Sequence, residues 1–179
     1  CQKTHVVNYG LSEKLSAWAP NCEVLTLDEL TEGAACTVLK ARQLIDSDSP
    51  LMIANCDQYV DTAIDAYLEC LNEKDLDGLI MTMSANDPKW SFVELDNNNF
   101  VTRVVEKEVI SEEATVGIYN FATGKDFVTG ADEMISCEER VNGEFYVAPV
   151  YNRLIKKKRR VGIYNIGTDV LGMYGLGTP

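Results

Sequence analysis

The chain has 179 residues, of which 46% are hydrophobic and 25% charged, which is ordinary for a globular protein with one sizeable core. Its formal net charge of −12 argues against nucleic acid as a partner, because a nucleic-acid-binding surface needs concentrated positive charge. No apolar run approaches the length of a membrane span, so we expect no interaction with a membrane.

The first half of the chain alternates between strand and helix patterns. In chain order we expect strand, helix, strand, helix, strand, helix and strand over Thr4–Asn8, Leu11–Ala19, Cys22–Asp28, Gly33–Ile45, Leu51–Cys56, Asp61–Lys74 and Gly78–Ala85. Leu51–Cys56 is an unbroken apolar run, which is typical of a strand buried on both faces. Asp61 is a candidate N-cap for the helix that it begins.

The second half departs from this alternation. Trp90–Leu95 and Phe100–Lys107 flank the turn-forming residues 96–99 and predict a β-hairpin. A strand, two helices and a last strand are expected over Thr115–Ala122, Lys125–Glu139, Glu144–Lys158 and Val161–Ile166, before a glycine-rich tail at 171–179.

Together these patterns predict an α/β fold, a mostly parallel sheet sandwiched by helices with an inserted β-hairpin, in a single domain over residues 1–179. The chain opens inside a strand pattern and closes on Gly-Thr-Pro, which would normally begin a helix. We therefore expect this domain to be truncated at both ends.

Asp57 is the first candidate functional residue, because it follows the Leu51–Cys56 pattern directly and has Asn55 and Gln58 beside it. In open α/β sheets, ligands bind beyond the carboxyl ends of the strands. A carboxylate there suits Mg²⁺, although one carboxylate makes a weak site unless substrate phosphates supply further oxygen ligands. A polar strand end without a function explains the same residues about equally well.

Three other segments have features of a binding site. Thr31-Glu32-Gly33 is a turn before a helix, where glycine lets a ligand approach the backbone. Glu106 and Lys107 end a hairpin strand, where a carboxylate can bind sugar hydroxyls and an ammonium can bind phosphate, although strand neighbours point to opposite faces. Gly117 interrupts a strand, which indicates either close approach of a ligand or another backbone, or a bulge or tight packing. Taken singly, an ordinary turn, edge strand or bulge also explains each segment.

The basic residues, the cysteines and the single histidine argue against several kinds of site. Positive charge is concentrated over residues 153–160, which we interpret as a solvated helix end rather than a site for an anion or an acidic partner. The six cysteines are scattered and form no Cys-x-x-Cys pair, which favours a reduced, cytoplasmic protein. His5 is the only histidine, which argues against a zinc site or a Ser-His-Asp triad.

The order and spacing of the motifs say more than any one of them. Five motifs occur in a fixed order: Thr-Glu-Gly-Ala-Ala at 31–35, Asn-Cys-Asp-Gln at 55–58, Val-Glu-Lys at 105–107, Val-Gly-Ile-Tyr at 116–119 and Gly-Leu-Gly-Thr-Pro at 175–179. This series resembles the sugar-phosphate nucleotidylyltransferase family. The resemblance to these nucleotide-sugar pyrophosphorylases covers nearly the whole chain and is greatest for the bacterial branch linked to capsule and surface-polysaccharide synthesis.

This resemblance implies a Rossmann-like nucleotide-diphospho-sugar transferase fold, with Mg²⁺ as cofactor and a nucleoside triphosphate and a sugar 1-phosphate as substrates. It leaves homo-oligomerisation open. Asp57 would bind the metal and Lys107 the sugar phosphate, so these two residues would carry catalysis. The nucleotide would lie against Thr31, Glu32, Gly33 and Asn55, and the sugar against Ser91, Glu106, Lys107, Thr115, Gly117 and Tyr119.

Two departures from the family keep other functions open. The family's glycine-rich loop is absent from this sequence, and Gly175 stands where many members have a second metal ligand. A glycosyltransferase of the related nucleotide-sugar fold, or a non-catalytic nucleotide-sugar-binding domain, would fit the same motifs. Whether these residues suffice for activity by themselves is also open.

Overall fold

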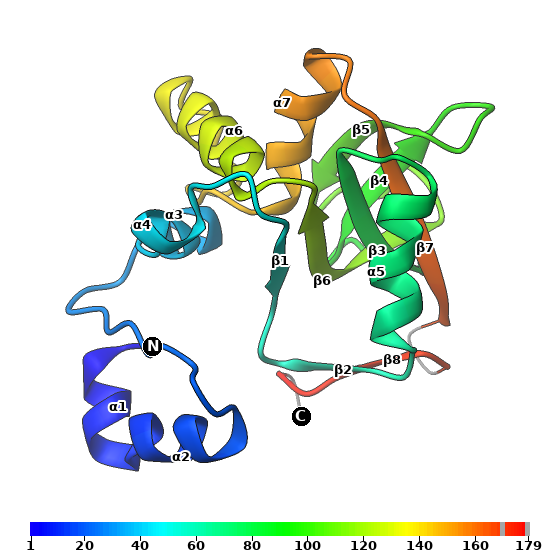
Figure 1. Cartoon of the computed structure of the whole chain (residues 1–179). Helices are drawn as coiled ribbons and strands as arrows, with labels where there is room; N and C mark the ends of the chain where they lie inside the picture. Colours follow the sequence, from blue (N-terminus) through cyan, green and yellow to red (C-terminus); the bar gives the residue numbers. More distant parts are fainter. Residues whose placement is uncertain (169–170, 178–179) are drawn as a thin grey trace.

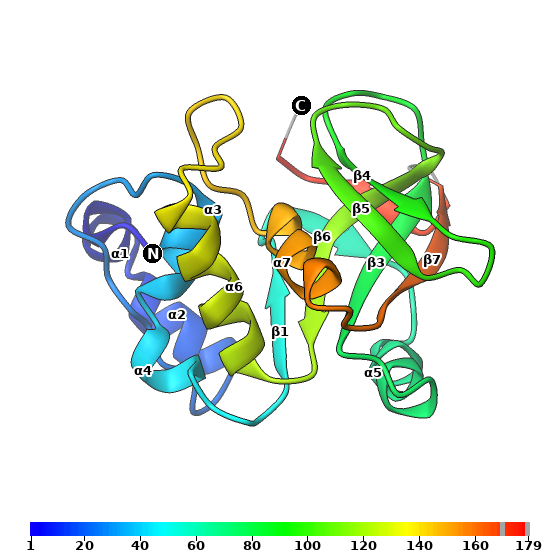
Figure 2. The same cartoon turned by 90° about the horizontal axis from the view of Figure 1, so that it is seen from above.

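The computed structural model describes residues 1–168 and 171–177, and its centre is a sheet with helices on both faces (Figures 1 and 2). The central sheet contains β1 (Leu51–Ala54), β3 (Gly78–Ser84), β4 (Ser91–Leu95), β5 (Val101–Glu106), β6 (Glu113–Phe121) and β7 (Val161–Thr168). Two short strands, β2 (Gln58–Val60) and β8 (Met173–Gly175), form a separate ribbon that was not predicted. The expected α/β class with a helix-flanked sheet is confirmed.

The sheet is mixed, and this corrects the expectation of a mostly parallel one. Its strands follow the order β5-β4-β6-β3-β7, and β1 also pairs with β6. Among the described pairs only β3 with β7 is parallel, because β6 runs against β1, β3 and β4. The predicted hairpin is confirmed as the antiparallel pair β4–β5.

Two apolar cores cover the two faces of the sheet. One core packs α6 (Gly124–Ser136) and α7 (Tyr151–Lys156) against one face through residues such as Phe121 and Phe127. The other packs α5 (Ile64–Glu73) against the opposite face through Tyr67 and Met81. Figure 2 shows α5 on one side of the sheet and α6 and α7 on the other.

The β1 strand is less buried than the unbroken apolar run predicted. Ile53 is buried, Leu51 is half-buried, and Met52 and Ala54 are exposed, so burial on both faces was wrong. Within the described residues, β6 is the only strand that pairs with β1, so the other edge of β1 has no strand partner.

The N-terminal segment differs most from the prediction. The helix α2 (Leu11–Trp18) is confirmed, but Thr4–Asn8 lies in a helix, α1 (Lys3–Tyr9), and not in a strand. Cys22–Asp28 forms no strand, and its only β-structure is a parallel bridge between Gln2 and Leu27. Because neither helix buries a residue, α1 and α2 lie away from the sheet (Figure 1).

Three predicted helices have different limits. Gly33–Ile45 is divided into α3 (Ala34–Leu39) and α4 (Arg42–Ile45). The N-cap of α5 is Ala63, so Asp61 is not a cap, and its N–H instead donates to the carbonyl of Gly172 at 2.7 Å. In Glu144–Lys158, only a short 3₁₀ helix η1 (Ala148–Val150) and α7 are helical.

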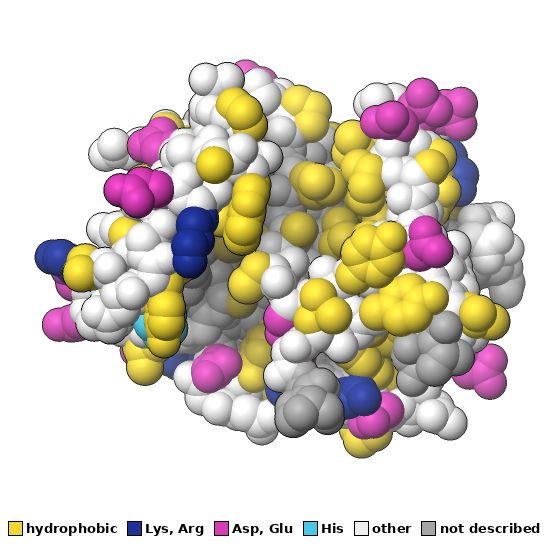
Figure 3. All heavy atoms as spheres, turned by 90° about the horizontal axis from the view of Figure 1, so that it is seen from below, with side chains coloured by type: hydrophobic (Ala, Val, Ile, Leu, Met, Phe, Trp, Pro, Cys, Tyr) yellow, Lys and Arg dark blue, Asp and Glu magenta, His cyan; other side chains and the backbone are white. Residues whose placement is uncertain are grey.

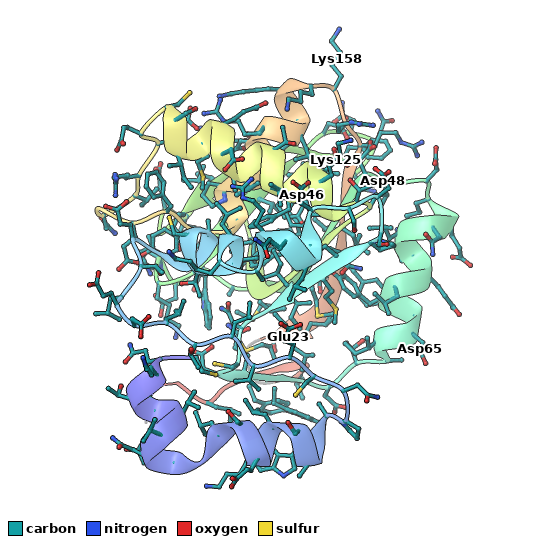
Figure 4. All side chains as sticks on the ribbon, turned by 60° about the vertical axis from the view of Figure 1, so that its left-hand side comes forward. Glu23, Asp46, Asp48, Asp65, Lys125 and Lys158 are labelled. Carbon is teal, nitrogen blue, oxygen red and sulfur yellow. The ribbon has the colours of Figure 1, made fainter. Side chains whose placement is uncertain are left out.

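The basic segment at residues 153–160, which includes the last turn of α7, behaves as a solvated helix end. Arg153 pairs with Glu139 at 2.8 Å, Lys157 with Glu133 at 2.6 Å and Arg159 with Asp77 at 2.9 Å. Figure 4 shows Lys158 pointing away from the protein. Because neighbouring carboxylates neutralise most of this charge, the segment gives no support to an anion site.

The structure can be compared with the expectations for membrane-spanning helices and for the cysteines. Over the described ranges, no helix has both the length and the apolar character that crossing a membrane requires. All six cysteines are free thiols in the structure. Thr178 and Pro179, the end of the Gly-Leu-Gly-Thr-Pro motif, lie outside the described residues.

Candidate functional site

A cavity of about 300 Å³ opens beyond the carboxyl end of β1. Eight of the eleven residues that the sequence singled out line it, namely Asn55, Asp57, Ser91, Glu106, Lys107, Thr115, Gly117 and Tyr119. An adjoining hollow of about 440 Å³ shares Asp57 and Lys107 with this cavity and extends to Met173 and Gly175 of β8. Figure 3 shows the hollowed face of the protein.

A bulge in β6 brings Asn55 to the cavity wall. The register between β3 and β6 shifts around Gly117, whose φ of +75° lies in the left-handed region. A Cβ atom at this position would lie 2.5 Å from Asn55 Nδ2 and 2.7 Å from Gln58 Oε1. The glycine therefore makes room for these two amides, so the bulge and tight packing that the sequence offered as an alternative to ligand approach are both observed.

Glu106 is the buried carboxylate of the cavity and is only 8% exposed. Ser91 Oγ donates a hydrogen bond to Glu106 Oε2. Burial raises the pKa of the Glu106 carboxyl above its ordinary value of 4.5, while this hydrogen bond and the charge of Lys107 lower it in part. Since Lys107 Nζ lies 3.9 Å from Glu106 Oε1, that oxygen remains available to a donor from a ligand.

Lys107 faces the same cavity as Glu106, although strand neighbours were expected to point to opposite faces. The reason is that β5 ends at Glu106, and Lys107 takes a left-handed conformation with φ of +58°. Its N–H donates to the carbonyl of Trp90 at 3.0 Å, and its Nζ lies 5.6 Å from the ring centre of Tyr146. The turn thus places an ammonium and a carboxylate side by side.

Thr115 and Tyr119 form the buried polar wall of the cavity. Their hydroxyl oxygens lie 3.0 Å apart, and both residues are almost fully buried. Burial raises the pKa of Tyr119 to about 12, so its hydroxyl stays protonated and can donate as well as accept. Together with Ser91 and Glu106, this wall suits a ligand that carries several hydroxyl groups.

Asp57 lies at the mouth of the cavity and is exposed. The described residues contain no group of three His, Cys, Asp or Glu side chains that could hold a metal by themselves. The oxygens at hand are the Asp57 carboxylate and the amide oxygen Oε1 of Gln58, which is buried and has no hydrogen-bond partner. This donor set fits Mg²⁺, which is usually held by one or two carboxylates, waters and substrate phosphates.

The turn Thr31-Glu32-Gly33 lies beside the cavity rather than in it. Thr31 and Glu32 line a separate hollow of about 590 Å³, whereas Ala34 lines the cavity with Asp57. Gly33 has φ of +122°, and a Cβ there would lie 2.5 Å from the carbonyl oxygen of Phe145. The backbone that comes close to this glycine is therefore the protein's own.

Five residues of the cavity wall were not predicted from the sequence, namely Lys89, Trp90, Tyr146, Val147 and Ala148. The last three follow a tight hairpin in which Val141 and Glu144 exchange two backbone hydrogen bonds of 3.0 Å. Asn142 and Gly143 have φ of +50° and +84°, as a two-residue hairpin turn requires. The Asn-Gly pair was the available signal, but we had assigned the following residues to a helix.

Comparison with known proteins shows the fold. A nucleoside-diphosphate-sugar pyrophosphorylase from Vibrio cholerae is 23% identical, with a TM-score of 0.80 over 99% of this chain and 75% of that chain. A Bacillus anthracis structure described as a glucose-1-phosphate thymidylyltransferase, in complex with sucrose, is 16% identical, with a TM-score of 0.73 over 96% of this chain and 67% of that chain.

A UDP-glucose pyrophosphorylase complexed with UDP-glucose is 12% identical, with a TM-score of 0.72 over 97% of this chain and 68% of that chain. No protein-family model matches the sequence, and no curated sequence matches it significantly. The chain therefore has the fold of nucleotide-sugar pyrophosphorylases, at sequence identities too low to establish a reaction.

Proposed function

We propose that the chain belongs to a nucleotidylyltransferase that joins a nucleoside triphosphate to a sugar 1-phosphate and releases pyrophosphate. The observation that carries the proposal is that eight residues, selected for this activity from four separate segments of the sequence, line one cavity. The fold shared with structures described as pyrophosphorylases and as a thymidylyltransferase supports the same class of reaction.

The chemistry of the cavity wall suggests how the sugar phosphate binds. Glu106 Oε1 and the hydroxyls of Thr115 and Tyr119 would bind sugar hydroxyls. Ser91 would hold Glu106 in place through its hydrogen bond, and the Lys107 ammonium, beside that carboxylate, would bind the sugar phosphate. The sugar would then lie in the buried part of the cavity, with its phosphate toward Asp57.

The nucleotide would approach from the side of Asp57 and Asn55, with its base toward the turn Thr31-Glu32-Gly33. Asp57, with the phosphate oxygens, would hold Mg²⁺, which neutralises charge on the triphosphate. A sugar phosphate oxygen would attack the α-phosphorus in line, forming one P–O bond while the bond to the pyrophosphate oxygen breaks. The protein contributes positioning and electrostatic stabilisation, as in other phosphoryl transfers.

The test is pyrophosphate release by the full-length protein with Mg²⁺, pooled nucleoside triphosphates and pooled sugar 1-phosphates. We expect release that is lost in Asp57→Asn and kept in the matched control Asp65→Asn, which lies at the start of α5 (Figure 4) and lines neither hollow described above. Equal release by the wild type and Asp57→Asn would contradict the role of Asp57. No release from any pair of substrates would refute the transferase and favour a binding domain.

A further inference from the structure

The hairpin Val141–Glu144 and Phe145 connect the two sides of the proposed site. Phe145 N–H donates to the carbonyl of Glu32 at 2.8 Å, and the N–H of Ala35 donates to the carbonyl of Phe145 at 3.0 Å. Phe145 itself is fully buried. These bonds join the turn at residues 31–33 to the backbone of Phe145, two segments more than 100 positions apart in sequence.

The Arg140 side chain contacts side chains of the same two segments. Its guanidinium carbon lies 4.1 Å from the centre of the Phe145 ring, a stacking distance, and Nη2 lies 3.3 Å from Glu32 Oε2. Nε donates to Glu138 at 2.7 Å and Nη1 to the carbonyl of Gly143 at 3.3 Å. One planar side chain therefore contacts the turn, the hairpin and the end of α6.

The residue after Phe145 reaches the phosphate side of the cavity. Tyr146 lines the cavity, and Lys107 Nζ lies 5.6 Å from its ring centre. A shift of Phe145 relative to Glu32 would therefore move the Tyr146 ring against Lys107. Arg140 lines neither the cavity nor the hollow that adjoins it, so its effect on a ligand must pass through these neighbours.

From these contacts we infer that Arg140 is a positioning residue, which holds the Thr31–Gly33 turn and Tyr146 in fixed relation across the site. The inference rests on the proposed function, because it assigns the turn to nucleotide and Lys107 to phosphate. Arg140 also neutralises Glu32 and Glu138, whose carboxylates would otherwise repel an anionic nucleotide. Both effects predict weaker nucleotide binding when Arg140 is replaced.

The test compares Arg140→Met with Arg140→Lys and with the matched control Arg42→Met. Arg42 also forms a partly exposed ion pair, with Asp132 at 2.5 Å, but it joins α4 to α6 outside the cavity. Binding of ATP, CTP, GTP, UTP and dTTP with Mg²⁺ is followed by the fluorescence of Trp90, a cavity residue, in a Trp18→Phe background. Amide exchange at Ala35 and Phe145 reports the junction itself.

For the tightest nucleotide we expect Arg140→Met to raise the Kd about tenfold, a change equivalent to about 1.4 kcal/mol. Exchange at Ala35 and Phe145 should also become faster, while Arg42→Met changes neither readout. Arg140→Lys should recover part of the affinity, since it keeps the charge but not the planar stack on Phe145. In turnover, the KM for nucleotide should rise more than kcat falls.

The outcomes separate the inference from the proposed function. If the unsubstituted chain binds nucleotide and Arg140→Met binds it equally well, the inference is wrong and the proposed function stands. Unchanged exchange at Ala35 and Phe145 in Arg140→Met would also overturn the inference, whatever the activity. If the full-length protein with Arg140 intact binds none of the five nucleotides, the proposed function fails and the inference fails with it.

Discussion

Replacing Gly117 by alanine tests whether the bulge in β6 builds the cavity. The new Cβ would lie 2.5 Å from Asn55 Nδ2 and 2.7 Å from Gln58 Oε1, in a backbone conformation with φ of +75°. The left-handed conformation costs about 1–2 kcal/mol for a residue other than glycine, and overpacking adds about 1–3 kcal/mol. We expect Gly117→Ala to lower the free energy of unfolding by roughly 2–5 kcal/mol.

Urea unfolding followed by circular dichroism would measure this change, and thermal unfolding should show a Tm lower by roughly 4–20 °C. Gly175→Ala is the matched control, because a Cβ there meets nothing within 4 Å and its φ lies outside the left-handed region. If Gly117→Ala unfolded within about 0.5 kcal/mol of the wild type, Asn55 and Gln58 would not occupy this space as described, and the account of the bulge would be refuted.

Three further predictions concern the metal, a buried carboxyl and a buried hydroxyl. Calorimetry should show that Mg²⁺ alone binds weakly, that nucleotide tightens it, and that Asp57→Asn removes the effect; strong binding without nucleotide would contradict a site with one carboxylate. Because the pKa of Glu106 is raised in the folded protein, the folded state holds the proton more tightly than the unfolded state, and the wild type should lose stability as pH rises above about 4.5. Glu106→Gln should not show this loss. If the difference in unfolding free energy between the wild type and Glu106→Gln stayed constant from pH 4 to 7, the raised pKa of Glu106 would be contradicted. Tyr67→Phe should cost about 1 kcal/mol in urea unfolding, because the Tyr67 hydroxyl donates to the buried carbonyl of Leu79 at 2.8 Å; no measurable change would mean that this bond adds nothing.

The sequence alone was sufficient for the elements whose side chains follow a local period. The strand pattern at Gly78–Ala85, the hairpin at Trp90–Lys107 and the helix at Leu11–Ala19 all correspond to observed elements. Asp57, Glu106, Lys107 and Gly117 could be singled out because strand ends and glycines inside strands are local signals. The choice of Ser91, Thr115 and Tyr119 came instead from the resemblance of the motif series to a known family. Hydrophobic periodicity depends only on which face of an element is buried. It can therefore be recognised without knowing which other element packs against that face.

What the tertiary structure alone decided is how distant segments meet. No local pattern shows that β6 runs against β1, β3 and β4, since strand direction depends on the path of the chain between the strands. Lys107 faces the cavity because of its left-handed backbone conformation. Tyr146 lines the cavity because the preceding hairpin is hydrogen-bonded to a turn more than 100 residues away in the sequence. The sequence thus determined which residues were available for chemistry, whereas long-range hydrogen bonds and packing determined which of them share one cavity.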